Sequence, residues 1–284
     1  MTKTRFDYDS EIAWCPGCGD FRILDALKLA LDESGLSPEN VVVASGIGQG
    51  AKTPHYMKVN GFNGLHGRTL PVATGIKASN TSLTVVTIGG DGDMYGEGGN
   101  HFIHTIRRNP DITSIVCNNM IYGLTKGQMS PTTPKGNKTT TSPHGVTNEP
   151  FNPLAIAIVS GATFVARCFA GDVEETKNLI KEGIKHKGFA LIDIFQPCVS
   201  FNTTNTWQWF KENTKWLDEK ENKTDILEAL KLSMETSPYN LGILYKKDST
   251  QSFEDFQPAW NRGDNRPLFE RKANTEAVKE FLKS

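Results

Sequence analysis

Short apolar runs alternate with segments of helical periodicity along most of the chain. Phe21, Leu24, Leu27 and Leu31 recur at helical spacing before Gly35 and predict a first helix. Uniformly apolar runs, typical of strands buried on both faces, lie at 41–45, 83–90, 114–119, 163–167 and 190–195. Further helices are predicted over 97–108 and 173–187. Because single helices separate the runs, the pattern predicts an α/β fold, a mostly parallel sheet flanked by helices.

Two regions depart from this alternation. The segment 126–150 is rich in Thr, Pro, Gly and Asn, and so long a loop in a compact domain is expected to be disordered or to form a functional lid. After Phe201 the composition shifts to Lys, Glu, Asn and Trp, with helical periods around 207–216 and 226–234. We therefore predict an α/β domain over 1–204 and a C-terminal extension over 205–284. The simplest role for three tryptophans of the extension is to anchor it by packing: Trp207, Trp209 and Trp216.

Length and charge exclude several classes of function. The 284 residues have room for two domains, or for one large α/β domain with a tail. The 31 basic and 32 acidic residues give a net charge of -1, so neither nucleic acid nor an anionic membrane is an expected partner. The longest apolar stretch, 154–166, is shorter than the ~20 residues of a bilayer span. Acidic residues occupy the place of a secretory apolar core, so a cytoplasmic location is expected.

The strongest chemical signal is a Gly-Asp-Gly turn after one predicted strand and an Asn pair after the next. Asp91 follows the run 83–90, and Asn119 ends the run 114–119. Adjacent strands lie ~4.8 Å apart, so a Mg²⁺ ion with oxygen ligands at ~2.1 Å could bridge the two side chains. The glycines around Asp91 would let a diphosphate approach the backbone, and a following helix N-terminus would favour its charge. The alternative is a Gly-Asp turn with an unrelated Asn pair, which this order of elements disfavours.

A second signal is the pair Cys15 and Cys18 in CPGCG. Five cysteines, an odd number, favour free thiols or metal ligands over disulfides. A thioredoxin-like redox pair would follow an apolar strand, and a zinc site would need a second ligand pair at comparable spacing. An iron–sulfur cluster is the third interpretation, and the residues alone do not choose among the three. Cys117 and Cys168 fall in or beside predicted strands and are expected to be buried.

Taken together, these motifs resemble those of a known family. GDG followed further along by NN is the thiamine-diphosphate signature, and GGDGDMYGEGGNHFIHTIRRNPDI, YGLTKGQ, CPGCG and SGIG resemble the β subunit of 2-oxoacid:ferredoxin oxidoreductases, over roughly 14–205. The resemblance implies the pyrophosphate-type thiamine-diphosphate-binding fold. It also implies oxidative decarboxylation of a 2-oxoacid, pyruvate or 2-oxoglutarate, with coenzyme A, the electrons passing through an iron–sulfur cluster to ferredoxin.

The resemblance also implies the ligands of each group. Mg²⁺ would be held by Asp91, the Asn119 side chain and the backbone carbonyl of Ile121. A 4Fe–4S cluster would be held by Cys15, Cys18 and Cys198. Further residues would line thiamine diphosphate, with His66 near the diphosphate: Gly46, Ile47, Gly48, His66, Gly90, Gly92, Asp93, Gly123 and Leu124.

The chain departs from the family at one cluster ligand. Members with four cysteine ligands carry one directly after SGIG, where this chain has Gln49. The fourth ligand is left open among Gln49, His55, a solvent or thiolate species, and a residue brought in by the fold. The carboxylate that activates the aminopyrimidine comes, in this class of enzyme, from a separate pyrimidine-binding domain. We therefore expect an α subunit, in a heterodimer or heterotetramer, and no activity of this chain alone.

Two lysines and two histidines have weaker signals. Lys52 and Lys126 lie next to the predicted cofactor loops, where an ammonium could pair with a 2-oxoacid carboxylate, the alternative being two solvated surface lysines. His101 and His104 are spaced like metal ligands on a helix, but such pairs usually pack, and packing is favoured.

Two other functions remain open at this point. A non-redox thiamine enzyme subunit, from a decarboxylase or a transketolase, would be excluded by a bound cluster. A non-catalytic iron–sulfur electron carrier would be favoured by failure to bind thiamine diphosphate.

Overall fold

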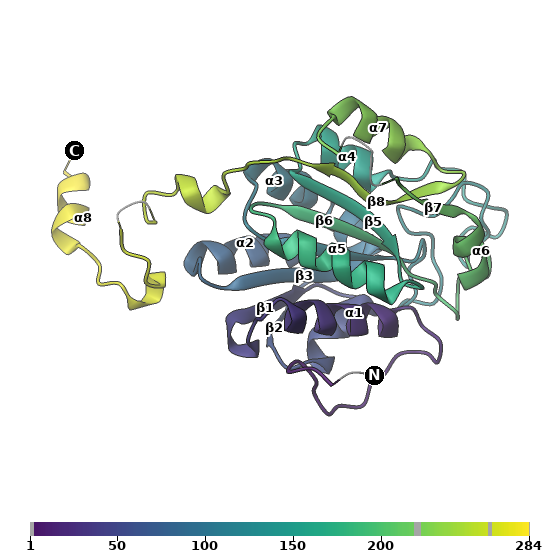
Figure 1. The fold of residues 1–284 in the computed structure, drawn as a ribbon, viewed down its shortest axis with the longest axis horizontal. Coiled ribbons are helices and arrows are strands. Elements are labelled where there is room, and N and C mark those ends of the chain that lie inside the picture. The colour runs from purple at the N-terminus through teal and green to yellow at the C-terminus, as the bar shows by residue number, and fades with distance from the viewer. Residues whose placement is uncertain (1–2, 219–222, 261–262, 284) are drawn as a thin grey trace.

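The computed structural model describes residues 3–218, 223–260 and 263–283. Within them the strands form one sheet in the order β2-β1-β3-β4-β6-β5-β8-β7 (Figure 1). The strands are β1 (Val41–Ser45), β2 (Asn60–Asn63), β3 (Thr84–Gly90), β4 (Thr113–Asn118), β5 (Phe164–Phe169), β6 (Ala190–Phe195), β7 (Thr214–Trp216) and β8 (Tyr239–Lys246). Neighbouring strands run parallel except β5 and β8, so the prediction of a mostly parallel sheet is confirmed.

Helices cover both faces of the sheet. One face is covered by α1 (Asp20–Glu33) and α5 (Val173–Lys185), and the other by α2 (Thr69–Ser79), α3 (Gly99–Arg108), α4 (Pro153–Val159) and α7 (Ile226–Met234). Successive strand residues serve the two cores in turn: Val86 packs beneath α1 and Val85 beneath α2. Because both faces of the central strands are buried, these strands appear in the sequence as unbroken apolar runs.

The remaining short elements lie at the ends and edges. They are α6 (Trp207–Glu212), α8 (Thr275–Phe281) and the turns Pro38–Asn40, Gly50–Tyr56, Gly92–Glu97, Phe253–Phe256 and Leu268–Glu270. The turn Phe253–Phe256 lies against the body, where Glu254 Oε2 accepts a hydrogen bond from the Asp111 backbone N–H, whereas α8 lies away from the body (Figure 1). No helix in the described ranges has the length and apolarity needed to cross a bilayer.

The structure differs from the sequence expectations at several places, and β8, α2, α4 and α8 were not predicted. The helical period over 207–216 is wrong in its second half, because α6 ends at Glu212 and Trp216 lies on β7. β2 is an exposed edge strand of sequence NGFN, so it has no apolar run to reveal it. The segment 126–150 has neither helix nor strand, as predicted.

The order of the strands determines where a site can form. β1, β3, β4 and β6 are parallel neighbours, so their C-terminal ends meet at one edge of the sheet. The segments that follow these ends begin at Gly46, Asp91, Asn119 and Gln196. In open parallel sheets this edge is where ligands bind.

Candidate active site

A glycine-lined cavity lies at this edge of the sheet. Apart from Gly46, every residue predicted to line a cofactor or to bind Mg²⁺ lines it: Ile47, Gly48, His66, Gly90, Asp91, Gly92, Asp93, Asn119, Ile121, Gly123 and Leu124. Gly46 lies just outside, where a Cβ would come 2.2 Å from Oδ2 of Asp93. The structure therefore brings together residues that are dispersed over four segments of the sequence.

Asp91 is the buried acid of this cavity, with 1% of its surface exposed. The hydroxyls of Ser130 and Thr132 each donate to its Oδ2 at 2.5 Å. Burial raises the pKa of Asp91 to about 6, because water no longer solvates the carboxylate. A cation next to this carboxylate would offset that penalty.

Asn119 begins a tight backbone turn that lines the cavity. Its Oδ1 accepts a hydrogen bond from the Ile121 backbone N–H at 3.1 Å, which folds the chain so that both residues line the cavity with Asp91. The set offers a carboxylate, a side-chain amide and a backbone carbonyl. An all-oxygen set of this kind fits Mg²⁺.

Asp93 fixes the loops around the cavity that it lines. It is buried, and it accepts hydrogen bonds from the backbone N–H groups of Ile47 at 3.1 Å and Gly67 at 2.8 Å and from the Thr69 hydroxyl at 3.1 Å. His66 Nδ1 lies 2.6 Å from Asp93 Oδ1, and its Nε2 lies 3.1 Å from a Glu97 carboxylate oxygen. One carboxylate thus ties together the loops after β1 and β2.

Two glycines show why this cavity needs residues without a Cβ. At Gly92 a Cβ would lie 2.1 Å from the Tyr122 ring, a distance that no side chain could occupy. Gly48 has a φ of +134° and open space where a Cβ would project, so its backbone is accessible from the cavity. The accessible glycine backbone fits the close approach of a phosphate group.

Part of the loop over 126–150 supports the site. Ser130, Thr132 and Thr133 are buried, and the Thr133 hydroxyl donates to the Met120 carbonyl at 2.7 Å. Because two of these residues hold Asp91, this part of the loop has a defined place in the structure.

A second cavity contains the three predicted cluster cysteines. Cys15, Cys18 and Cys198 line it together with Gln49. Four residues line both this cysteine cavity and the glycine-lined one, so the two adjoin: Gln49, Asn119, Gly123 and Gln196.

Three side-chain oxygens around the cysteine cavity have no hydrogen-bond partner. They are Oδ1 of Asp20 and Oε1 of Gln49 and Gln196, all buried. Burial and the nearby Asp20 carboxylate raise the pKa of the Cys18 thiol, so its thiolate needs positive charge close by. Gln196 Nε2 donates to Cys18 Sγ at 3.3 Å. Buried oxygens without a partner, next to a half-buried thiol whose pKa is raised, form a chemical environment in which an iron–sulfur cluster fits.

The cysteines do not form a site for one ion. Among the residues that the structure describes, no three His, Cys, Asp or Glu side chains converge closely enough to hold a single metal ion. A cluster takes one thiolate on each iron, so its ligands surround it instead of meeting at a point. Cys117 and Cys168 are buried, as expected. His55 is exposed and is not among the residues lining the cavity, whereas Gln49 is.

The other predicted residues lie outside both cavities. Lys126 is exposed, with a φ of +77°, and Lys52 is half-buried; neither lines the glycine-lined cavity. His101 is half-buried and His104 exposed on α3, and neither belongs to a metal-binding group of described residues.

Sequence reasoning missed the residues that support each cavity. Ser130 and Thr132 lie in a polar loop without periodicity, and only their closeness to the YGLTKGQ motif could have indicated them. Asp20 follows the CPGCG motif directly, and Gln196 begins the QPC motif. Their position close to cysteines in the sequence could have indicated them.

Comparisons with known proteins agree with this geometry. Residues 41–194 match the family model of the C-terminal thiamine-pyrophosphate-binding domain of thiamine pyrophosphate enzymes. Residues 198–261 match the model of the C-terminal part of the pyruvate ferredoxin oxidoreductase β subunit. The two matches follow one another along the chain and together extend from β1 past β8.

Relatives with known names resemble almost the whole chain. It is 40% identical to 2-oxoacid:ferredoxin oxidoreductase 2, subunit beta, of Aeropyrum pernix, over 90% of this chain and 87% of that one. It is 43% identical to the 2-oxoacid:ferredoxin oxidoreductase subunit beta of Saccharolobus solfataricus, over 95% of each. A solved structure of 2-oxoglutarate:ferredoxin oxidoreductase from Magnetococcus marinus, with 2-oxoglutarate, coenzyme A and succinyl-CoA bound, matches with a TM-score of 0.91 and 32% identity, over 99% of this chain and 97% of that one.

Proposed function

The chain belongs to the family of 2-oxoacid:ferredoxin oxidoreductase β subunits, and from this membership we propose how its two cavities are used. The glycine-lined cavity binds thiamine diphosphate with Mg²⁺, and the cysteine cavity binds a 4Fe–4S cluster. With an α subunit, the protein carries out coenzyme A-dependent oxidative decarboxylation of a 2-oxoacid, with ferredoxin as electron acceptor. The observation that carries the proposal is that Asp91, Asn119 and Ile121 line one cavity, which adjoins the cavity of the three cysteines.

In the glycine-lined cavity, Asp91, Asn119 and the Ile121 carbonyl are the proposed Mg²⁺ ligands. Thiamine diphosphate, when bound, supplies the carbon nucleophile and the electron sink that decarboxylation requires. The protein's part is to hold the ligands in place: Ser130 and Thr132 orient Asp91 through hydrogen bonds that need no rearrangement.

In the cysteine cavity, Cys15, Cys18 and Cys198 are the proposed ligands of three irons. Gln49 lines the same cavity with an unpartnered Oε1, so it is the proposed neighbour of the fourth iron. An amide oxygen is a hard donor, which an iron–sulfur cluster binds less strongly than thiolate. The hydrogen bond from Gln196 to Cys18 would raise the reduction potential by stabilising negative charge on sulfur.

The substrate carboxylate is proposed to pair with Lys126 or Lys52. Lys126 is separated by one residue from Leu124, which lines the glycine-lined cavity, and its ammonium is exposed. The two substrates to compare are 2-oxoglutarate, which is bound in the Magnetococcus marinus structure, and pyruvate. The α subunit would supply the carboxylate that activates the aminopyrimidine, so this chain alone should be inactive.

The test is co-purification with the α subunit without oxygen, followed by an assay of ferredoxin reduction that depends on 2-oxoacid and coenzyme A. Asp91→Asn should abolish the reduction, whereas Cys168→Ser, a buried thiol outside both cavities, should not. Lys126→Ala should raise the KM for the 2-oxoacid and leave thiamine-diphosphate affinity unchanged. Decarboxylation without ferredoxin reduction would favour a non-redox thiamine enzyme, and a cluster without thiamine-diphosphate binding would favour an electron carrier.

A further inference from the structure

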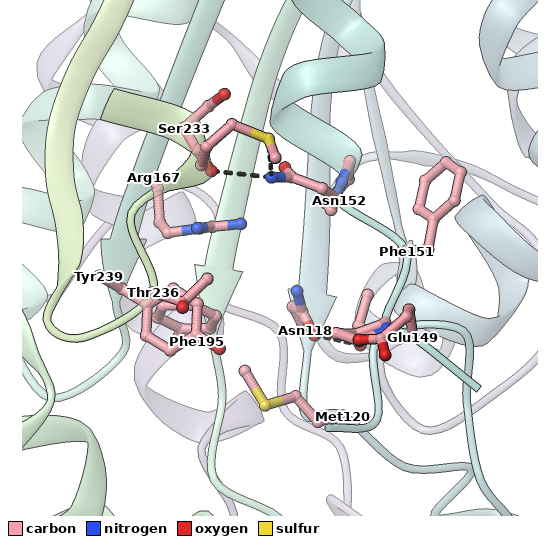
Figure 2. A pocket seen from close by; sticks show the side chains of 14 residues that line it. Asn118, Met120, Glu149, Phe151, Asn152, Arg167, Phe195, Ser233, Thr236 and Tyr239 are labelled. Carbon is pink, nitrogen blue, oxygen red and sulfur yellow. Dashed lines mark hydrogen bonds between the residues drawn. The ribbon is translucent and has the colours of Figure 1, made fainter. Parts of the chain in front are cut away.

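A third cavity lies on the other side of the segment that follows β4. Its volume is about 280 Å³, and it is lined by parts of β5, β6, β8 and the chain before α4 (Figure 2). It shares no lining residue with the glycine-lined cavity. Alternate residues of the segment line the two: Asn119 and Ile121 the glycine-lined cavity, Asn118 and Met120 this one.

Arg167 of β5 is the charged group of this cavity, and we call it the Arg167 cavity. The residue is 5% exposed, and its Nε donates to Asp193 Oδ2 at 2.8 Å. The guanidinium lies 4.6 Å from the centre of the Phe195 ring and 5.6 Å from that of the Tyr239 ring. Figure 2 shows its terminal nitrogens extending into the space between Asn152 and Asn118.

The pairing with Asp193 uses only one edge of the guanidinium. Among the described residues Asp193 is its one hydrogen-bond acceptor, and the bond comes from Nε. A guanidinium has five N–H groups, so the four on the two terminal nitrogens have no protein acceptor there. A purely structural pair would more often be bidentate, because two parallel bonds are stronger than one.

The Asp193 carboxylate has other hydrogen-bond donors besides Arg167. The Tyr95 hydroxyl donates to its Oδ1 at 2.9 Å, and Asn118 Nδ2 lies 3.1 Å from Oδ1 and 3.3 Å from Oδ2. Arg167 is thus fixed in place by one bond and two rings while its outer edge faces the cavity. Four N–H donors with no protein acceptor, directed into a cavity from a buried residue, form a prepared site for an anion.

The shape and lining of the cavity narrow the class of ligand. Its volume lies just below the ~300–1,000 Å³ of pockets that hold drug-sized molecules. Apolar side chains line much of the cavity, among them Met120, Phe151, Phe195 and Met234. The single positive charge is already shared with Asp193, so a dianion would be poorly compensated.

We propose that the Arg167 cavity binds a small monocarboxylate with a short apolar body. The carboxylate accepts hydrogen bonds from both terminal nitrogens of Arg167, and the apolar body replaces water against the methionine and phenylalanine side chains. This site is separate from the one at which the proposed 2-oxoacid chemistry takes place, and its existence does not depend on that proposal.

The test is titration calorimetry on the complex with the α subunit, using three probes. Butyrate has the charge and the apolar body, butyramide has the body without the charge, and inorganic phosphate has charge without the body. Butyrate should bind, and each of the others should bind about tenfold more weakly or worse, because hydrogen bonds to a charged group are the strong ones. Equal binding of butyrate and butyramide, or no binding of butyrate, overturns the proposal.

Two variants locate the binding. Arg167→Lys retains the positive charge beside Asp193 but lacks the two terminal nitrogens that bind both carboxylate oxygens, and it should weaken butyrate binding about tenfold or more. Thr236→Phe, which fills the cavity from an exposed position without touching the ion pair, should abolish it. The second variant keeps the proposal testable if the first fails to fold. Unchanged butyrate affinity in Thr236→Phe overturns the proposal.

Glu149 gives a matched pair of charge variants. It is exposed, lines the cavity and pairs with Lys135. Glu149→Gln should strengthen butyrate binding about two- to threefold, because it removes one negative charge and frees the Lys135 ammonium. Glu276→Gln on α8, which also breaks an exposed pair with a lysine but lies outside the cavity, should change nothing. Equal effects of the two variants would mean that butyrate binds elsewhere.

Discussion

The two adjoining cavities at the sheet edge differ in how their buried polar atoms are paired. Around the glycine-lined cavity, Asp91 and Asp93 accept hydrogen bonds from hydroxyl and backbone groups of three segments. Around the cysteine cavity, Asp20, Gln49 and Gln196 each leave one oxygen without a partner. The first cavity is therefore preorganised by the protein itself, whereas the second depends for its electrostatic balance on the group that it binds.

The largest effect should come from a substitution in the glycine-lined cavity, measured as a loss of thiamine-diphosphate affinity. Asp91→Asn keeps the shape of the residue but removes the charge that the proposed Mg²⁺ requires. Thiamine-diphosphate affinity measured by calorimetry with Mg²⁺ should fall about 100-fold or more, since a charged ligand to the ion is lost.

Iron content is the internal control for this variant. It should stay at the wild-type value, because no cluster ligand is altered. A variant that loses both thiamine diphosphate and iron would show that the two cavities are not independent, which would break the comparison.

The next largest effect concerns the cysteine side. Cys198→Ser should remove the visible charge-transfer absorption of thiolate-bound iron, while thiamine-diphosphate affinity changes little. The control is Cys168→Ser, because Cys168 is fully buried against the core and lies outside both cavities. If both variants bleach the absorption equally, the ligand assignment is wrong.

The same contrast explains what could be predicted from the sequence. The ends of β1, β3 and β4 are marked by glycines and by Asp91 and Asn119, because a close backbone approach and a metal ligand need those residue types at those places. All but one of the predicted cofactor residues consequently line one cavity. Cys15 and Cys18 are visible as a close pair in CPGCG, whereas Cys198 was indicated only by the resemblance to the family.

The supporting residues could not be predicted in this way. Ser130 and Thr132 reach Asp91 from a loop about 40 positions further along the chain, a contact that depends on tertiary packing and leaves no periodic trace. Arg167 and Asp193 lie opposite each other on β5 and β6, and each interrupts an apolar run that the sequence indicated as plain core. β2 and β7 were missed because edge strands are not buried on both faces.

A smaller effect should follow from changing the residue at which this chain departs from its four-cysteine relatives. Gln49→Cys places a soft sulfur where an amide oxygen now has no partner. Loss of one iron in air, followed as the appearance of a 3Fe signal in electron paramagnetic resonance, should slow about threefold to tenfold.

The matched control is Gln196→Cys, which also introduces a thiol at a residue with an unpartnered oxygen but removes the hydrogen bond to Cys18. That variant should not slow the loss. An equal effect of both substitutions would mean that added thiols protect the cluster without ligating the fourth iron.

The smallest effect is a pH dependence of the Tm, to which one acid of each cavity should contribute when no ligand is bound. Burial raises the pKa values of Asp91 and Asp20 from 3.8 to about 6. A carboxyl that holds its proton more tightly in the folded chain contributes stability that is fully present below the unfolded pKa and is lost as pH rises through the folded one. When the pH is lowered from about 7 to about 5, protonation of each acid should therefore raise the Tm of the metal-free chain, by about 2–4 °C for each kcal/mol of added stability.

Asp20→Asn should remove the contribution of the Asp20 carboxyl to this rise in Tm. Mg²⁺ with thiamine diphosphate, which bind charged Asp91, should remove the contribution of Asp91. The measurement is the difference in Tm between the two pH values for wild type and Asp20→Asn, each with and without Mg²⁺ and thiamine diphosphate. If Asp20→Asn shows the same difference in Tm between the two pH values as the wild type, the Asp20 carboxyl is already ionised at both. Its unpartnered oxygen would then not indicate an environment that needs a bound cation.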